Sequence, residues 1–402
     1  MSELNPPATE DPAGAADAAA SSAAAPTPEE AADAKRYAQA SLRLTVVDMV
    51  VDVAVLVAVA LLVGPWLDAW LGAWAPLSGE RSLLRVAALG GSITLLHTLA
   101  SLPISFYGGY VVEHRFGLST QSIGRWLKSW LKKSALALAL LVAMYTGLYA
   151  IIWWAGGWWW AVAAAAFFLV SAVLGQLLPV VILPLFQKTD PLPADACTDR
   201  MQEMAQRAGI TIDGVYRLEM SADTKKANAM LAGIGATRRV LLGDTLIEEF
   251  TPAEVEIVFA HELGHQVHRH LPKMLVFTAA ASLAGFWLCQ QGVAVWSGDS
   301  DPRQWSPATL PVLLLLLTTF SMLMGPLMNL LSRHFERQAD RYAAAATADL
   351  PAFRSAFLKL ARMNKAELEP GRIEEFLLHS HPSISERLRL VGADAEAPVP
   401  GR

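Results

Sequence analysis

Charged residues are scarce in this chain of 402 residues: they make up 17% of it, whereas hydrophobic residues make up 53%. Soluble domains are about a quarter charged, so much of this surface must face something other than water. The formal net charge of -5 is small, and the basic residues lie mostly beside apolar runs instead of in one cluster. Nucleic-acid binding requires a clustered basic face, so the composition predicts no nucleic-acid partner.

Cysteine is nearly missing as well. Cys197 lies in a polar stretch and Cys289 in an apolar one. We therefore expect two unpaired thiols and not a disulfide framework. The sequence also lacks a Cys-x-x-Cys pattern, so any metal must be held by histidine and carboxylate side chains.

The N-terminus lacks the basic start and early apolar core of a cleavable signal peptide. Residues 1–34 contain seven acids and no Lys or Arg, amid Ala, Pro and Ser. Such a segment has little apolar surface to bury. Residues 1–40 are therefore predicted to form a disordered acidic tail rich in Ala and Pro, and residues 391–402 a second disordered tail.

Long apolar runs dominate what remains, and six of them can each cross a bilayer, which takes about 20 residues of helix. They are Leu44–Val63, Val86–Phe106, Ala135–Trp154, Trp158–Leu185, Met274–Val295 and Leu310–Leu331. Only residues 155–157 separate the third run from the fourth, which indicates a tight helical hairpin. The pattern predicts a mainly α, polytopic membrane protein, a bundle of about six to seven transmembrane helices.

Two polar segments interrupt these runs and divide the chain. Residues 41–186 contain the first four membrane helices and 271–331 the fifth and sixth, which leaves 187–270 and 332–390 as the polar segments. Within the first of these, Gly214–Met220 and Arg239–Leu242 have the pattern of short strands, and Pro252–His270 has that of a helix. We therefore expect a small domain that contains a short β-sheet.

The distribution of Lys and Arg among the short loops predicts the orientation. Basic residues precede the first run and cluster between the second and the third, whereas the loop between the fifth and the sixth carries only Arg303. Arg81 and Arg85, in the first outer loop, fit less cleanly. The bias favours both termini and both polar segments on the cytoplasmic side.

The chemistry is concentrated in the pattern H-E-x-x-H at residues 261–265. Residues four apart share a helix face, so His261 and His265 can present imidazole nitrogens to one Zn²⁺ ion. Glu262 then lies where it can accept a proton from a water molecule. Thr251 followed by proline, with Glu254 three positions on, is typical of a helix start. The alternative is a helix whose two histidines merely cover a surface.

A catalytic zinc usually has three protein ligands. The best third candidate is Glu336, and Asp340, one helical turn further on, could accept a hydrogen bond from a ligating imidazole. The alternative for Glu336 is an ordinary solvated acid beside Arg333 and Arg337. Two membrane crossings separate the motif from Glu336 and return the chain to the same face, so the predicted topology allows the three ligands to meet.

Further motifs accompany H-E-x-x-H in order along the chain. They are Asn228-Ala229 with Gly233, His261-Glu-Leu-Gly-His265, Ser332-Arg333-x-x-Glu336-x-x-Ala339-Asp340, and His381-Pro382 with Arg387. Together they resemble the type I CAAX prenyl protease family of integral-membrane zinc metallopeptidases, which is related to the bacterial heat-shock membrane proteases. The resemblance covers residues 103–387.

The resemblance implies that the small domain with the short β-sheet is a zincin-like catalytic domain. It implies one zinc ion per chain, with Glu336 as third ligand and Glu262 as general base. It also implies that Asn228 and Ala229 lie on a strand edge that aligns the substrate backbone by strand addition. His381 would stabilise the oxyanion and Arg387 would support it. From the residues alone, His379 competes with His381, and His268 and His270 are interpreted as structural.

These features predict a membrane-embedded zinc endopeptidase that acts on membrane-associated or lipidated, CAAX-like proteins beside the lipid bilayer. A quality-control protease that degrades misfolded membrane proteins is the alternative within the same chemistry. A metal transporter would place its ligands within the membrane runs, and an inactive scaffold would not need Glu262. The catalytic site is expected on the cytoplasmic side, of the inner (plasma) membrane if the source is bacterial.

Overall fold

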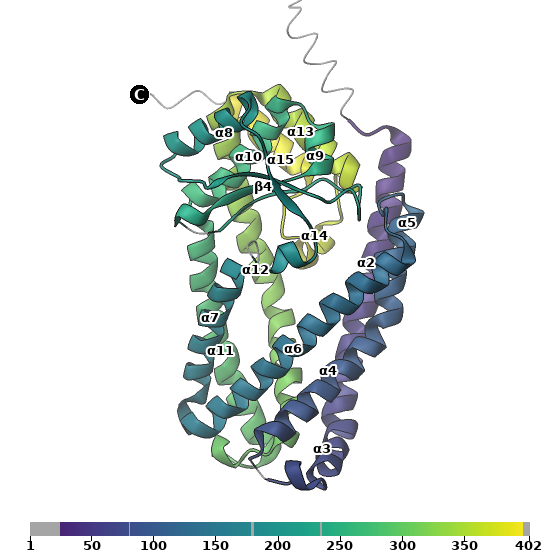
Figure 1. Cartoon of the computed structure of the whole chain (residues 1–402), viewed down its shortest axis with the longest axis vertical. Coiled ribbons are helices and arrows are strands. Elements are labelled where there is room, and N and C mark those ends of the chain that lie inside the picture. The colour runs from purple at the N-terminus through teal and green to yellow at the C-terminus, as the bar shows by residue number, and fades with distance from the viewer. Residues whose placement is uncertain (1–24, 80, 178–180, 234, 397–402) are drawn as a thin grey trace, which may run out of the picture.

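The computed structural model describes residues 25–79, 81–177, 181–233 and 235–396. Long helices form a bundle at one end of the molecule, and a small sheet with shorter helices lies at the other (Figure 1). The α12 helix (Leu310–Thr347) runs from the far end of the bundle up to the sheet. The prediction of a mainly α, polytopic membrane protein with a small β-sheet is confirmed.

Five helical stretches are long and apolar enough to cross a membrane among the described residues, namely Pro28–Gly72, Leu83–Arg115, Ile123–Gly175, His270–Ser297 and Pro307–Thr347. The third contains two helices, α6 (Ile123–Ala155) and α7 (Trp159–Leu177), which meet in the predicted hairpin. Gly156 makes this turn with a φ of 55°, a conformation that only glycine adopts without strain. Each of the six predicted apolar runs begins within one of the five stretches, and the third stretch contains two of them.

The other membrane helices are α2 (Pro28–Ala58), α3 (Gly64–Gly72), α4 (Leu83–Phe106) and α11 (His270–Ser297). A π-helical turn at Val59–Val63 joins α2 to α3, and another at Tyr107–Val112 joins α4 to the short α5 (Glu113–Arg115). Within the predicted fourth run, α7 is described as far as Leu177, and Leu183–Leu185 form a 3-10 turn. Residues 178–180 lie outside the described residues.

The predicted disordered tails are wrong where they overlap helices. Residues 28–40 begin α2, because Thr27 and Glu30 form a capping box and Pro28 occupies the first helical position. Residues 391–396 complete α15 (Ile384–Glu396), and the side chain of Val391 is buried in the core. Residues 1–24 and 397–402, the remainder of both tails, lie outside the described residues.

The sheet has four strands in the order β1-β2-β4-β3. They are β1 (Thr189–Pro191), β2 (Gly214–Leu218), β3 (Ala229–Ala232) and β4 (Arg239–Gly243). The pair β2 and β4 is parallel, and β3 joins β4 antiparallel, with Ala229 opposite Leu242. The two strands predicted from the residues are thus β2 and β4, and β1 was missed. The resemblance implied a strand edge at Asn228 and Ala229, and β3 begins at Ala229, directly after Asn228. Because β3 is at the edge, one side of its backbone has no strand partner among the described residues.

The shorter helices pack around the sheet into one apolar core. They are α8 (Ala196–Arg207), α9 (Asp244–Glu249), α10 (Pro252–Val267), α13 (Leu350–Asn364) and α15. The short α14 (Arg372–Leu378) has no buried residue and lies outside this core. The α10 helix crosses the middle of this core, where Ile257, Phe259 and Leu263 are fully buried. The predicted helix at 252–270 breaks near its end, since Arg269 takes a left-handed conformation (φ 53°) between α10 and α11.

Candidate metal centre

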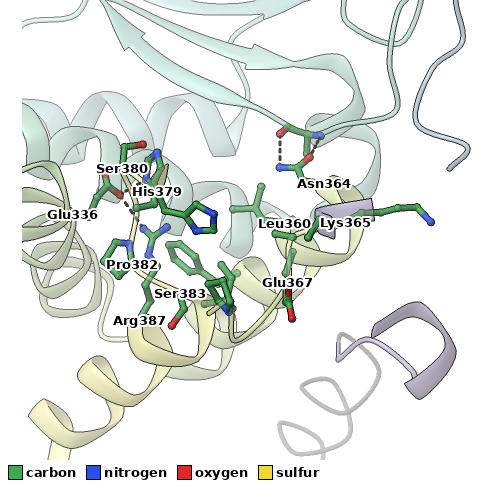
Figure 2. A pocket seen from close by; sticks show the side chains of 18 of the residues that line it. Glu336, Leu360, Asn364, Lys365, Glu367, His379, Ser380, Pro382, Ser383 and Arg387 are labelled. Atoms are coloured by element: carbon green, nitrogen blue, oxygen red, sulfur yellow. Dashed lines mark hydrogen bonds and ion pairs between the residues drawn. The ribbon is translucent and has the colours of Figure 1, made fainter. Parts of the chain in front are cut away.

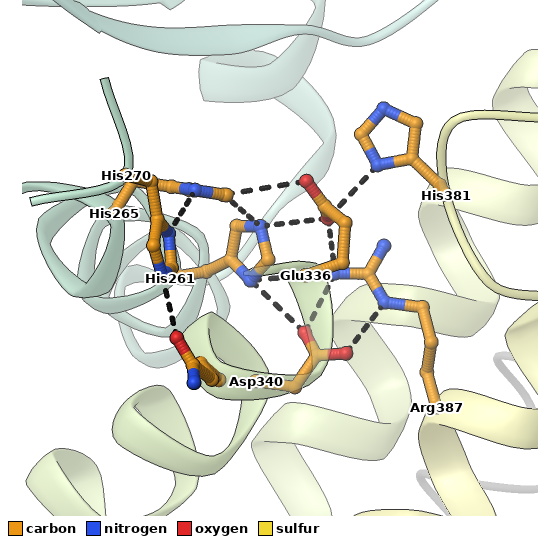
Figure 3. A network of polar contacts seen from close by, with 8 residues as sticks. His261, His265, His270, Glu336, Asp340, His381 and Arg387 are labelled. Atoms are coloured by element: carbon orange, nitrogen blue, oxygen red, sulfur yellow. Dashed lines mark hydrogen bonds and ion pairs between the residues drawn. The ribbon is translucent and has the colours of Figure 1, made fainter. Parts of the chain in front are cut away.

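The α10 helix places the two histidines of the motif side by side. Thr251 and Glu254 form the predicted capping box at its start. Glu254 is also held by Ser355 and Lys359 of α13, at 2.5 and 2.7 Å. Four residues apart on the anchored helix, His261 and His265 bring their Nε2 atoms to 3.2 Å from each other (Figure 3).

The α12 helix supplies the third member of the cluster. Glu336 Oε2 lies 3.3 Å from His261 Nε2, and Glu336 Oε1 lies 3.4 Å from His265 Nε2. One ligand atom from each of the three residues lies within 4.8 Å of the others. The structure therefore brings together His261, His265 and Glu336, which are 75 positions apart in sequence at most (261 to 336).

A close contact between α10 and α12 makes this meeting possible. Gly264 faces the backbone of Ala339: a Cβ at Gly264 would lie 3.0 Å from Ala339 Cα and 3.2 Å from its carbonyl oxygen. Any larger residue at position 264 therefore requires the helices to separate. Gly264 is one position before His265 and Ala339 is three after Glu336, so separation would move the ligands apart.

The residues present fit a divalent metal ion of the zinc class. Glu336 is 4% exposed, and its Oε2 atom faces nitrogens of His261, His381 and Arg387 at 3.3, 2.8 and 3.5 Å. A buried carboxylate is costly unless such polar or cationic groups face it, and a metal ion is one of them. Two imidazoles and one carboxylate are also the donor set of catalytic zinc sites. The burial and the donor set point to the same group.

Asp340 and Arg387 lie near the ring nitrogen of His261 that points away from the cluster. Asp340 Oδ1 lies 2.9 Å from His261 Nδ1, so the outer ring nitrogen has a carboxylate partner while Nε2 faces the cluster. Arg387 of α15 donates two hydrogen bonds to Asp340, at 2.6 and 2.8 Å. Arg387 thus touches the group that orients His261, and its Nη2 also lies 3.5 Å from Glu336 Oε2.

The electrostatic field at His261 favours a cation. Burial would lower the pKa of this imidazole, but hydrogen bonds with Asp340 and Glu336 outweigh burial and raise the pKa to about 9. Burial would likewise lower the pKa of Arg387, and the charge of Asp340 raises it. The two carboxylates therefore stabilise positive charge at this point, whether it is a proton or a metal ion.

The structure also assigns a partner to His265 that the sequence interpretation missed. His270 Nδ1 lies 2.9 Å from His265 Nδ1, and His270 Nε2 lies 2.9 Å from Gln338 Oε1 (Figure 3 shows His270 beside His265). His270 is buried and stacks on Phe335, with ring centroids 4.3 Å apart. No pattern in the sequence signals this contact, because it depends on the bend at Arg269 that returns His270 toward the cluster.

A cavity of about 680 Å³ opens onto the cluster. Glu262 lines it one position from His261, Ala229 lines it from the start of the edge strand β3, and Asn228 lines it just before that strand. The membrane helix α2 contributes a further part of the wall through Tyr37, Ser41 and Thr45. One cavity thus joins the predicted base, the predicted substrate edge and a membrane helix.

His379 and His381 both lie in the loop after α14 but contact different groups. His381 Nδ1 lies 2.8 Å from Glu336 Oε2, and its side chain is 62% exposed. His379 instead lies 3.3 Å from Glu374, and its carbonyl accepts a hydrogen bond from Arg333. Both line the cavity, and Figure 2 shows His379 among the residues around it. Of the two, His381 is next to the cluster.

Family profiles match nearly the whole chain. Residues 191–393 match the profile of peptidase family M48, and residues 15–188 match a profile described as the CAAX prenyl protease N-terminal region with five membrane helices. In this second region the described residues provide four long helices, α2, α4, α6 and α7, and the short α3.

Curated relatives match over most of their length. The chain is 29% identical to an uncharacterized metalloprotease, YhfN, of Bacillus subtilis, over 76% of this chain and 73% of the relative. It is 26% identical to CAAX prenyl protease 1 of Saccharomyces cerevisiae, over 74% and 70%. The crystal structure of S. mikatae Ste24p has the same fold, with a TM-score of 0.78 at 23% identity, covering 91% of this chain and 89% of that chain.

We predict that Gly264→Ala loses bound metal and loses stability. The added Cβ would press on the backbone of Ala339, which cannot rotate away, so α10 and α12 must separate and Glu336 moves from the histidines. Metal content per chain and the thermal unfolding temperature measure this. Gly147→Ala in α6, where a Cβ would meet nothing within 4 Å, is the control and should match the wild type. Full metal content in Gly264→Ala would show that the close contact is not required.

Proposed function

The chain belongs to peptidase family M48, and on that premise we propose that it is a zinc endopeptidase that cleaves lipidated proteins at the membrane surface. As a member of this family it is a metallopeptidase, and its apolar helices make it a multi-pass membrane protein. The observation that carries the proposal is the shared cavity, in which a membrane helix, an edge strand and the metal cluster face one another.

In this proposal His261, His265 and Glu336 hold one zinc ion, which would supply Lewis-acid polarisation of a peptide carbonyl and of water. Glu262 accepts the proton of the attacking water and returns it to the leaving amide nitrogen. His381 borders the cluster from the open side of the cavity, so it is our candidate donor to the developing oxyanion.

Asp340 and Arg387 act on the zinc ligand His261 and not on the substrate. Asp340 accepts from His261 Nδ1 and so fixes which ring nitrogen faces the zinc ion. Arg387 holds both oxygens of Asp340 and is a positioning residue one step further out. Arg387 thus acts on the metal side of the cavity, through Asp340, whereas the resemblance assigned it to the support of the oxyanion.

The edge strand β3 is the proposed binding surface for the substrate backbone. Its free side can accept an extended peptide as an additional strand, with Asn228 and Ala229 at the cavity end. The relatives named CAAX prenyl proteases suggest the substrate class, a protein with a prenylated C-terminal segment. Multi-site degradation of misfolded membrane proteins is the second candidate, since an edge strand reads backbone and not side chains.

We further propose that the catalytic site faces the cytoplasm. Arg115 before α6 and the basic residues in the first turns of α6 favour this side, namely Arg125, Lys128, Lys132 and Lys133. The loop between α11 and α12 carries only Arg303. Arg85 does not oppose this orientation, because it is paired with the buried Asp68 of α3, with Nε donating to Oδ1 at 2.6 Å. Arg81 is then the one basic residue of the loop between α3 and α4 that counts against this orientation.

Cleavage of a farnesylated peptide tests the substrate and the base together. We expect the wild type to release one short C-terminal peptide from a farnesylated CAAX peptide, and to leave the unprenylated peptide and a denatured membrane protein largely uncut. Glu262→Gln should bind zinc as the wild type does but lose activity by at least about 100-fold, since proton transfer is typically worth 10²–10⁴-fold. Equal cleavage of all three substrates would favour the quality-control function, and full activity of Glu262→Gln would refute the mechanism.

Substitution of Glu336 tests whether this residue is the third zinc ligand or an ordinary solvated acid. Glu336→Ala should lose both zinc and activity, because two imidazoles alone hold zinc weakly and both histidines lose their shared carboxylate. Zinc per chain by atomic emission and peptide cleavage are the measurements. Glu374→Ala, which removes a carboxylate beside His379 in the same cavity, is the control and should keep its zinc. Zinc retained in Glu336→Ala would require another third ligand.

Cysteine labelling in intact cells tests the orientation. In a Cys197→Ser background, Ser300→Cys in the loop after α11 should react with a membrane-impermeant maleimide from outside the cell. Gln202→Cys on α8 should react only after lysis; both positions are exposed. The opposite labelling pattern would place the cavity on the outer side.

A further inference from the structure

Ala227, the residue before the proposed substrate edge, has both of its backbone groups hydrogen-bonded to one side chain. Asn364, the last residue of α13, pairs with both backbone groups of Ala227: its Oδ1 accepts from the Ala227 N–H at 2.9 Å, and its Nδ2 donates to the Ala227 carbonyl at 3.1 Å (Figure 2). One donor and one acceptor on the backbone fix which way the amide points. The side chain thus occupies the place that a neighbouring strand would take.

The neighbours of Ala227 are held from the other side. The carbonyl of Asn228 accepts from the Gly243 N–H at 2.9 Å, and the carbonyl of Lys226 accepts from Thr245 Oγ1 at 2.8 Å. Successive residues of an extended chain direct their backbone groups to opposite sides. The sheet side therefore fixes Lys226 and Asn228, and Asn364 alone fixes both groups of the residue between them.

The side chain of Lys226 ties the same segment to the membrane helices. Its Nζ lies 2.9 Å from Tyr37 Oη of α2 and 2.9 Å from Glu113 Oε2 of α5. Tyr37 in turn donates to Glu113 at 2.5 Å. These contacts limit how far residue 226 can move, but they do not set the rotation of the next peptide plane. That rotation decides which backbone groups of β3 face the cavity.

Asn364 also lies at the cavity itself. It lines the same space as Asn228, Ala229 and Glu262, so its amide borders the path of any peptide that joins β3. We propose that Asn364 is a positioning residue for substrate: through Ala227 it sets the register of the β3 edge relative to Glu262. This inference rests on the proposed function of β3 as the substrate edge, and it names a residue outside the motifs of the sequence.

Kinetics of two variants test this role. Asn364→Asp keeps the shape and the acceptor but loses the Nδ2 donor, and Asn364→Ala loses both bonds. With the farnesylated peptide we expect KM to rise about tenfold for Asn364→Ala, the factor expected for lost hydrogen bonds that align the substrate equally in the bound and transition states, with kcat changed by less than about threefold. Asn364→Asp should raise KM as well, since its carboxylate repels the Ala227 carbonyl. Arg354→Ala, an exposed change on the same helix, is the control.

Hydrogen exchange supplies a readout that does not depend on the substrate. In the full chain in detergent, the amides of residues 227–232 should exchange faster in both Asn364 variants than in Arg354→Ala, while α10 around His261 and the zinc content stay unchanged. Unchanged exchange at 227–232, or a fall in kcat at constant KM, would overturn the inference. If the wild type does not cut the prenylated peptide, the proposed substrate fails, and the exchange measurement still decides the role of Asn364.

Discussion

Helices α10 and α12 approach each other closely, because Gly264 leaves no side chain between its own backbone and that of Ala339. Every group of the metal cluster depends on this contact, since α10 contributes two imidazoles and α12 one carboxylate. The contact also places Asp340 against His261, and through Asp340 it engages Arg387 of α15. Buried charges of this kind are stable only when each has its partners, so α10, α12 and α15 must assemble together.

A second constraint couples this assembly to the membrane helices. The α12 helix is continuous from the membrane bundle to Glu336, and its length of 38 residues leaves no hinge loop between span and ligand. On the opposite side of the cavity, α2 reaches the catalytic segments through Tyr37, which meets Lys226, and through Asp33, which pairs with Lys365 at the end of α13. The cavity is therefore walled by helices that are anchored in the bilayer, which suits a peptide presented at the membrane surface.

Strand β3 lies at the edge of the sheet, next to β4. An unpaired strand edge is a template for another chain. The first residue of β3, Ala229, borders the cavity together with Asn228 and Glu262. In our proposal the bonds of Asn364 to Ala227 fix the segment before this edge, so that an added strand meets one register.

The sequence by itself determined the membrane runs, the helix start at Thr251 and the pairing of His261 with His265, because these depend on hydropathy and on local helical geometry. The prediction of Glu336 as the third ligand also depended on the predicted topology. Two membrane crossings between His265 and Glu336 place both residues on the same side of the membrane. Only the resemblance indicated β3, since a short edge strand lacks alternation. The helix at residues 28–40 was missed, since a charged helix start resembles a disordered tail. Contacts made across the fold, His270 with His265 and Asn364 with Ala227, were decided by tertiary structure alone: each joins groups whose approach depends on how separate helices pack.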